Sequence, residues 1–168
     1  MVSDGGSDDF DAFFRREYRS LVGLALVLTG DRGAAEDLAQ DALLAAHRRW
    51  DQLAEYDDPG AWVRRAVANR SASMWRRRTR ELRAMTRLGH RALEVVPALD
   101  PSADEFWDTV RTLPPRQAQC IALLYLEDRS TAETAEILGI APATVRVHLH
   151  EARATLAHRL RESEEGTP

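Results

Sequence analysis

Apolar residues recur at spacings of three and four along much of this 168-residue sequence, which is the period of an amphipathic α-helix. One stripe predicts a helix over 10–28 that ends at Thr29-Gly30-Asp31, and the next predicts a helix over 34–50. The apolar residues are mostly helix formers, with 26 Ala and 20 Leu against 10 Val and 3 Ile. Because no convincing strand pattern accompanies them, the sequence predicts an all-α protein.

Two groups of helices are separated by a stretch without a sustained period. Asp58 followed by Pro59 predicts the N-cap and the first residue of a third helix. Further along, Ser102 with Glu105 resembles a capping box that opens a short helix. We therefore expect two small helical domains and a linker between them, with these bounds: 1–85, 107–162 and, for the linker, 86–106.

Spaced residues near the C-terminus predict a helix-turn-helix. Ser130 and Glu133 form another capping box, and Ala135, Gly139 and Val145 then fit a helix crossing, a turn with positive φ and an apolar anchor. The second helix, over 142–160, would bury Val145, Leu149, Ala152, Leu156 and Leu160. Its opposite face would present six side chains to a major groove: Thr144, Arg146, Val147, His148, His150 and Arg153. An ordinary helical hairpin has the same spacing, but the cap, the turn and the basic face together favour a DNA-binding helix.

Positive charge is concentrated in one segment of an otherwise acidic chain. The net charge is −4, yet residues 60–91 hold ten Arg against the single Glu81, a net charge of +9, while residues 1–59 carry −7. A phosphate backbone responds to such a local patch, because salt screens charges beyond about 8–10 Å. Trp62 and Trp75 lie among these arginines, a combination suited to phosphate contacts and to stacking on unpaired bases. Trp62 fits a core position equally well, whereas we expect Trp75 to be exposed.

Several features argue against an enzyme, a cofactor site or a metal site. Cys120 lies on the apolar stripe of its helix, so we expect it in the core rather than as a nucleophile. His148 and His150 are two positions apart on a helix, so their side chains diverge and cannot chelate one metal ion. No glycine-rich phosphate loop occurs, and the longest apolar run, 21–28, is too short to span a bilayer. A single cysteine excludes an intrachain disulfide, and we expect a cytoplasmic protein without membrane insertion.

Six short motifs precede or adjoin the helix-turn-helix in a fixed order: LVGLALVLTGD (21–31), AEDLAQDAL (35–43), WVRR (62–65), ANR (68–70), WRRR (75–78) and LPPRQ (113–117). Together they resemble the extracytoplasmic-function group of bacterial RNA polymerase sigma factors, of the actinobacterial SigE-like type. The resemblance covers about residues 10–83 and 108–160. It implies a factor that binds core RNA polymerase and directs promoter-specific transcription initiation, with the N-terminal domain at the minus-ten element and the C-terminal domain at the minus-thirty-five element.

The resemblance also implies roles for individual residues. The polymerase-binding residues would be Glu36, Asp37, Gln40 and Asp41, on a helix that docks on the clamp helices of the largest polymerase subunit. The residues that hold the minus-ten element would be Trp62, Arg65, Asn69, Trp75, Arg76, Arg77, Arg78 and Arg80. The minus-thirty-five residues would be the six groove-facing side chains named above. The flap of the second-largest subunit and an anti-sigma factor are further implied partners.

Two alternatives stay open on the sequence alone. The segment 144–149 also resembles the helix-turn-helix of response-regulator effector domains, which would make the N-terminal half a sensor or dimerisation module. Val147 and Glu151 stand where sigma factors often have Ser and Arg, and Ala141 is a poor helix cap. A sigma-like protein that binds polymerase with weakened promoter recognition is therefore the second alternative.

Overall fold

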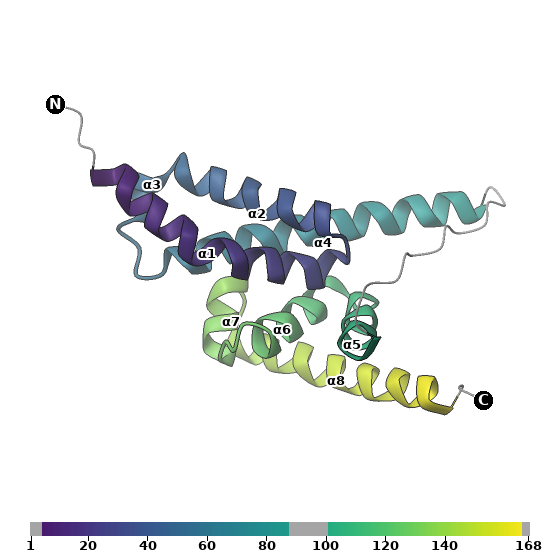
Figure 1. Cartoon of the computed structure of the whole chain (residues 1–168). Helices are drawn as coiled ribbons and strands as arrows, with labels where there is room; N and C mark the ends of the chain where they lie inside the picture. The colour runs from purple at the N-terminus through teal and green to yellow at the C-terminus, as the bar shows by residue number, and fades with distance from the viewer. Residues whose placement is uncertain (1–4, 88–100, 166–168) are drawn as a thin grey trace.

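The computed structural model describes residues 5–87 and 101–165, and within these ranges every regular element is an α-helix (Figure 1). The N-terminal bundle comprises α1 (Gly5–Thr29), α2 (Arg32–His47), α3 (Trp50–Leu53) and α4 (Pro59–Arg87). The C-terminal bundle comprises α5 (Pro101–Arg111), α6 (Pro115–Tyr125), α7 (Thr131–Leu138) and α8 (Pro142–Glu165). The all-α prediction is confirmed.

The N-terminal bundle buries the stripes that the sequence predicted. On α2 all six apolar stripe residues within the helix are buried: Ala35, Leu38, Ala39, Ala42, Leu43 and Ala46. The α1–α2 turn uses Gly30 at φ +72°, followed by Asp31, whose side chain accepts a hydrogen bond from the Ala34 N–H at 2.7 Å. Likewise, Asp58 Oδ1 accepts from the Ala61 N–H at 3.0 Å at the start of α4.

The predicted helix over 34–50 is wrong at its C-terminal end. Helix α2 stops at His47, and Trp50 instead begins the short helix α3. The Trp50 ring lies 4.8 Å from the Phe13 ring and 5.2 Å from the Phe10 ring, measured between centroids. The burial of the large apolar indole against α1 therefore determines where α2 ends, and it outweighs the helical period of the local sequence.

The C-terminal bundle differs from the prediction at its ends. Helix α5 begins at Pro101, so Ser102 lies inside its first turn and is not the N-cap of a capping box. Proline suits this first position because its missing N–H would have no helical acceptor there. Both ends of the expected linker, 86–87 and 101–106, are helical. Leu160 is half-buried rather than a core residue, and α8 continues beyond it to Glu165.

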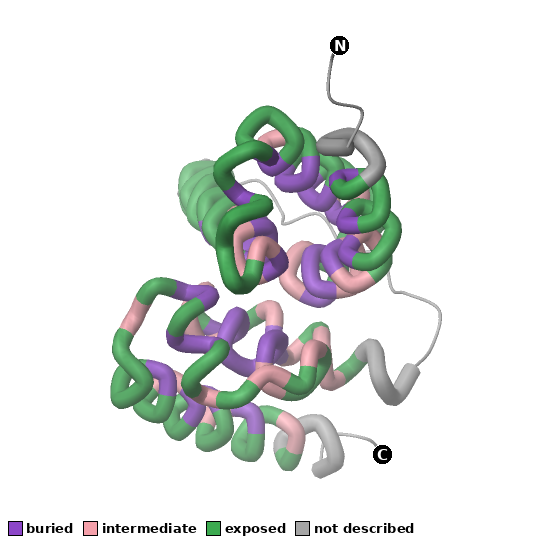
Figure 2. Tube along the Cα trace, turned by 90° about the vertical axis from the view of Figure 1, so that its left-hand side faces the viewer, coloured by how far each residue is buried: buried purple, intermediate pink, exposed green. Residues whose placement is uncertain are grey.

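The two bundles pack directly against each other. Helix α1 contacts α5 and α6, and α4 contacts α6 and α7. Figure 2 shows the bundles as an upper and a lower group, and their buried residues form one continuous apolar cluster. In Figure 1 the C-terminal part of α4 extends away from both bundles, and α2 and α8 lie on opposite outer sides of the molecule. None of the described helices is long and apolar enough to cross a membrane.

Candidate nucleic-acid and polymerase interfaces

The turn between α7 and α8 has the predicted geometry. Ser130 Oγ accepts a hydrogen bond from the Glu133 N–H at 3.1 Å, and the Glu133 carboxylate accepts one from the Ser130 N–H at 2.8 Å. The hydrogen bonds from Ser130, the backbone one most, lower the pKa of Glu133. Helix α7 ends at Leu138 and is capped by Gly139, with φ +65°, and the Ile140 N–H donates to Ala135 O at 3.1 Å. The capping box and the positive-φ turn are confirmed.

The outward face of α8 carries five of the six predicted groove-facing side chains. These are exposed: Thr144, Arg146, Val147, His150 and Arg153. His148 departs from the prediction, because it is half-buried and its Nδ1 atom is shielded from solvent, without a hydrogen-bond partner in the described part of the chain. It follows the buried Val145 by three positions and therefore lies at the edge of the apolar stripe.

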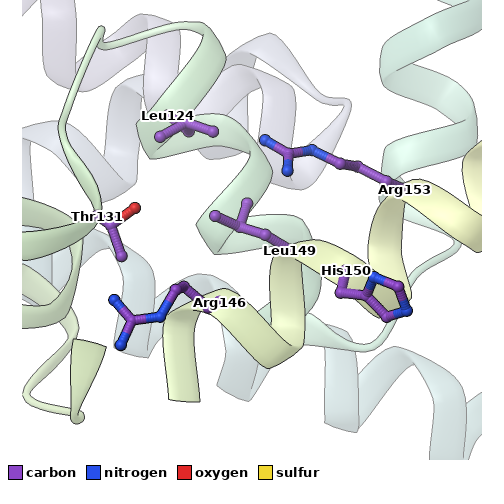
Figure 3. Close-up of a pocket in the computed structure, with 6 residues that line it drawn as sticks. All are labelled: Leu124, Thr131, Arg146, Leu149, His150 and Arg153. Atoms are coloured by element: carbon purple, nitrogen blue, oxygen red, sulfur yellow. The ribbon is translucent and has the colours of Figure 1, made fainter. Parts of the chain in front are cut away.

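A hollow of about 430 Å³ opens beside this face (Figure 3). Its lining comprises Leu124, Thr131, Arg146, Leu149, His150 and Arg153. In Figure 3 the two arginines stand on either side of Leu149. Arg153 Nε donates to Tyr125 Oη at 3.0 Å, and its guanidinium carbon lies 5.7 Å from the Tyr125 ring centroid. Two cations beside apolar side chains can neutralise phosphates while contacting a base edge or methyl group.

Glu151 is the acidic exception on this helix. Its carboxylate accepts a hydrogen bond from Gln117 Nε2 at 2.9 Å, which ties it to α6. Glu151 is exposed, so its negative charge stays near the hollow and opposes phosphate binding there. The favourable charge on this face therefore comes from Arg146 and Arg153.

The C-terminal part of α4 is an exposed basic surface. It includes the exposed residues Asn69, Arg76, Arg77, Arg78, Arg80 and Arg83. Arg77 Nε pairs with Glu81 at 2.9 Å, and Arg76 donates to Ser73 Oγ at 3.0 Å. Such surface pairs are weak, so they leave these guanidinium groups available to phosphates. The indole of Trp62 is half-buried and packs against the core.

Two predicted minus-ten residues lie at the boundary between the bundles instead. Arg65 donates from Nε to Ile137 O at 2.8 Å and from Nη2 to Glu136 O at 2.5 Å, at the end of α7. Trp75 is half-buried rather than exposed, and it lines a small crevice with residues of the C-terminal bundle that include Arg111 and Pro115. Nothing local in the sequence could identify these partners, because Arg65 precedes them by more than seventy positions.

Arg64 is an internal residue, although it belongs to the basic segment. It is only 4% exposed, and it donates from Nη1 to Glu17 at 2.8 Å and from Nε to Glu127 at 2.7 Å. Burial alone would lower the pKa of Arg64, but the hydrogen bonds and charges of Glu127 and Glu17 outweigh it and raise the pKa. The sequence contains a signal for the burial of Arg64, because Arg64 lies between Val63 and Val67 on the buried side of the helix.

The four predicted polymerase-binding residues lie on one side of α2. Asp37, Gln40 and Asp41 are exposed, and Glu36 is half-buried. Arg32 pairs with Glu36 at 2.9 Å, and Arg70 of α4 pairs with Asp41 at 2.6 Å. Helix α2 is remote from α8, as Figure 1 shows. A partner can therefore contact it while the helix-turn-helix remains accessible.

Cys120 is in the core, as predicted. Burial raises the pKa of its thiol to about 11, against a smaller lowering by Arg116. A thiol with so high a pKa is a poor nucleophile at neutral pH. Within 5–87 and 101–165, no cluster of His, Cys, Asp and Glu side chains is arranged to hold a metal ion.

Comparison with known proteins assigns both halves of the chain. Sigma-70 region 2 matches residues 13–81, and Sigma-70 region 4 matches residues 103–156. The chain is 31% identical over 154 residues to the RNA polymerase sigma-E factor of Streptomyces avermitilis, across 90% of this chain and 85% of that protein. It is 30% identical over 155 residues to the ECF RNA polymerase sigma factor SigM of Mycobacterium tuberculosis, across 90% of this chain and 76% of that protein.

Solved structures share the fold. The sigma factor RpoE of Bartonella quintana, in complex with the anti-sigma factor NepR, matches with a TM-score of 0.72 and 25% identity over 91% of this chain and 97% of that chain. CnrH in complex with the cytosolic domain of CnrY matches with a TM-score of 0.67 and 22% identity over 94% of this chain and 91% of that chain.

Proposed function

This chain belongs to the extracytoplasmic-function group of RNA polymerase sigma factors, and we propose that its three exposed surfaces divide the work of promoter recognition. As a member of this group it is a DNA-binding initiation factor that directs promoter-specific transcription with RNA polymerase. The response-regulator alternative required a sensor or dimerisation module in the N-terminal half. Residues 13–81 match sigma region 2 instead, which argues against that alternative.

The exposed basic surface of α4 holds the melted minus-ten strand in this proposal. Arg76, Arg77, Arg78 and Arg80 neutralise phosphates, and Asn69 and Trp62 contact bases. The support is the exposure of the four arginines on a helix segment that extends beyond the bundle, within a stretch of net charge +9. Asn69 is exposed and Trp62 is half-buried on the preceding part of the same helix. Arg65 and Trp75 join this surface only if their contacts with the C-terminal bundle are released.

The outward face of α8 recognises the minus-thirty-five element in this proposal. Thr144, Arg146, Val147 and His150 face the major groove, and Arg153 contacts the backbone. Val147, which is 54% exposed, offers a methyl-rich surface suited to a thymine methyl group. His148 supports the helix from within rather than contacting DNA.

The acidic side of α2 docks on the clamp helices of the largest polymerase subunit, and the C-terminal bundle contacts the flap of the second-largest subunit. The net charge of −7 over residues 1–59 supports an electropositive partner for α2. The complex of the structural relative RpoE with the anti-sigma factor NepR supports an anti-sigma partner for this chain as well. All these partners place its action in the cytoplasm.

One observation carries the proposal most directly: a single chain presents an exposed arginine surface on α4 and a helix-turn-helix face on α8. Run-off transcription with purified core polymerase and a promoter library tests it. We expect specific transcripts that need both promoter elements and that disappear when Asp37 and Asp41 are changed to Arg. Polymerase binding without any promoter-specific transcript would instead favour the second alternative, a sigma-like protein with weakened promoter recognition. The negative charge of Glu151 would be the structural reason for that weakness.

A further inference from the structure

Exposed side chains form two rows along the outward face of α8. One row, at spacings of four and three, is basic and lines the hollow of Figure 3: Arg146, His150 and Arg153. The other row, at spacings of three and four, lies beside it on the same helix: Thr144, Val147 and Glu151. At about 100° per residue, the two rows are turned well apart around the helix axis, so they face different parts of a DNA groove. The second row ends in a carboxylate, which is an unusual group on a DNA-binding face.

The Glu151 carboxylate is held by one of its two oxygens. Gln117 Nε2 of α6 donates to Glu151 Oε2 at 2.9 Å, and within 5–87 and 101–165 no other side chain donates to either oxygen or pairs with the charge. Because Glu151 is exposed, its Oε1 atom is an acceptor open to an incoming partner. The contact with Gln117 also restricts the rotamers of Glu151, so less conformational entropy is lost when Oε1 binds.

The chemistry of a carboxylate selects among the four base edges of the major groove. A carboxylate accepts hydrogen bonds and donates none. Guanine presents the acceptors N7 and O6 there, and thymine presents the acceptor O4 and a methyl group, so both repel a carboxylate. Adenine presents an amino group beside the acceptor N7, whereas cytosine presents its N4 amino group alone. Cytosine is therefore the base that fits Glu151 Oε1 best.

The second row has the length of a short run of base pairs. From Thr144 to Glu151 the helix rises about 10 Å, at ~1.5 Å per residue, and the major groove is about 12 Å wide. Glu151 follows Val147 by about one turn, a rise of ~6 Å, which corresponds to about two base pairs at ~3.4 Å each. With Val147 at a thymine methyl group, a cytosine within about two base pairs lies in reach of Glu151.

We propose that Glu151 is a base-reading residue that selects cytosine in the minus-thirty-five element, and that Gln117 is its positioning residue. The proposal rests on the proposed function, since it names the base preference of the same α8 surface. The carboxylate is repelled by the phosphates of every sequence, and this loss is offset only where an amino group donates to it. Discrimination at this position comes from rejection of guanine and thymine as much as from binding of cytosine.

Substitutions at Glu151 test the proposal, because each new side chain has its own preferred base. Core polymerase with the wild-type chain first selects promoters from a library, and competition binding then compares the four bases at each position of the selected upstream element. The wild type should prefer cytosine to guanine by about tenfold or more at one position. Glu151→Arg should prefer guanine there, through O6 and N7, and Glu151→Gln should prefer adenine, through N6 and N7.

The positioning role of Gln117 needs its own variant and a matched control. Gln117→Met removes the donor at similar side-chain length and should reduce the preference for cytosine by about threefold, with no change at the other positions. Glu105→Arg makes the same charge change as Glu151→Arg at an exposed position of α5. It should alter the affinity for all promoters alike and leave every base preference unchanged. Circular dichroism verifies that each variant keeps its helical content.

The possible results separate this proposal from the proposed function. Glu151→Gln has nearly the shape of the native side chain and can still accept from Gln117, so it remains informative even where Glu151→Arg disturbs the packing of α6 on α8. If the Glu151 variants change affinity equally for all four bases, the pair with Gln117 only joins two helices and the base-reading role is wrong. If the wild-type complex shows no base preference at any upstream position, the proposed function itself is wrong for α8.

Discussion

Gly139 and Arg65 meet across the boundary between the bundles, with the Arg65 guanidinium directly over a residue in the left-handed conformation. A Cβ there would stand 3.1 Å from Arg65 Nη2. The position therefore serves the turn of the helix-turn-helix and the contact between bundles together.

Gly139→Val should destabilise the protein by about 2 kcal/mol or more, because a β-branched residue is strained at φ +65°. Urea unfolding followed by circular dichroism measures the change. Gly139→Asn is the control, since asparagine tolerates positive φ while still adding a Cβ beside Arg65. An unchanged urea midpoint for the valine variant would contradict the assignment of a positive-φ turn at Gly139.

Replacing Arg76, Arg77 and Arg78 together with alanine should flatten the salt dependence of promoter binding by the polymerase complex. Each lost phosphate contact lowers the slope of log K against log salt by about 0.7–0.9, so the triple change should lower it by about two to three. The matched control removes three exposed arginines elsewhere, Arg15, Arg19 and Arg48. A full slope in the α4 variant would contradict the role of this surface.

Arg146→Ala should weaken binding to promoters with an intact minus-thirty-five element by about 1–3 kcal/mol and should relax base preference at one position. Competition binding with single-base promoter variants measures both effects. Arg161→Ala, at an exposed position near the end of α8, is the control and should change neither. A uniform loss over all sequences would mean that Arg146 contacts phosphate alone.

The capping box should make stability depend on acid through Glu133. Its pKa is lowered in the folded protein, so its contribution is complete above the ordinary glutamate value of 4.5 and is lost as pH falls through the folded pKa. Glu133→Gln should therefore lose less stability than the wild type between about pH 5 and pH 3. Glu136→Gln, on the same helix but without a bond to Ser130, should behave like the wild type in urea titrations at each pH.

Local signals were sufficient for much of the fold. The buried stripe of α2, the cap at Ser130 and the positive φ at Gly139 each depend on residues within one or two helical turns, which is the range over which sequence patterns act. Trp50 shows the limit, because its burial on Phe13 ended a helix that its own neighbours favour.

The candidate surfaces were only partly predictable for the same reason. The exposed arginines from Arg76 to Arg83 could be identified from charge alone, since the hydrogen bonds that they make within the described residues join them to neighbours three or four positions away on α4. Arg65 could not be separated from them, because the carbonyls that it binds are brought near only by packing of the two bundles. The edge position of His148 was visible in the helical period, but the period alone did not show which side of the ring would be covered.

Helix α4 is continuous from Pro59 to Arg87, so one rod carries Arg64 and Arg65 at one end and the exposed arginines at the other. Each residue added to an α-helix rotates the remainder of that helix by about 100° around its axis. A single insertion between these two groups would redirect the basic side chains around the rod without altering either group. The number of residues between the two groups of arginines is consequently under tighter constraint than the identity of those residues. Functional homologues should therefore show no insertions or deletions in this part of α4, even where its amino-acid sequence differs.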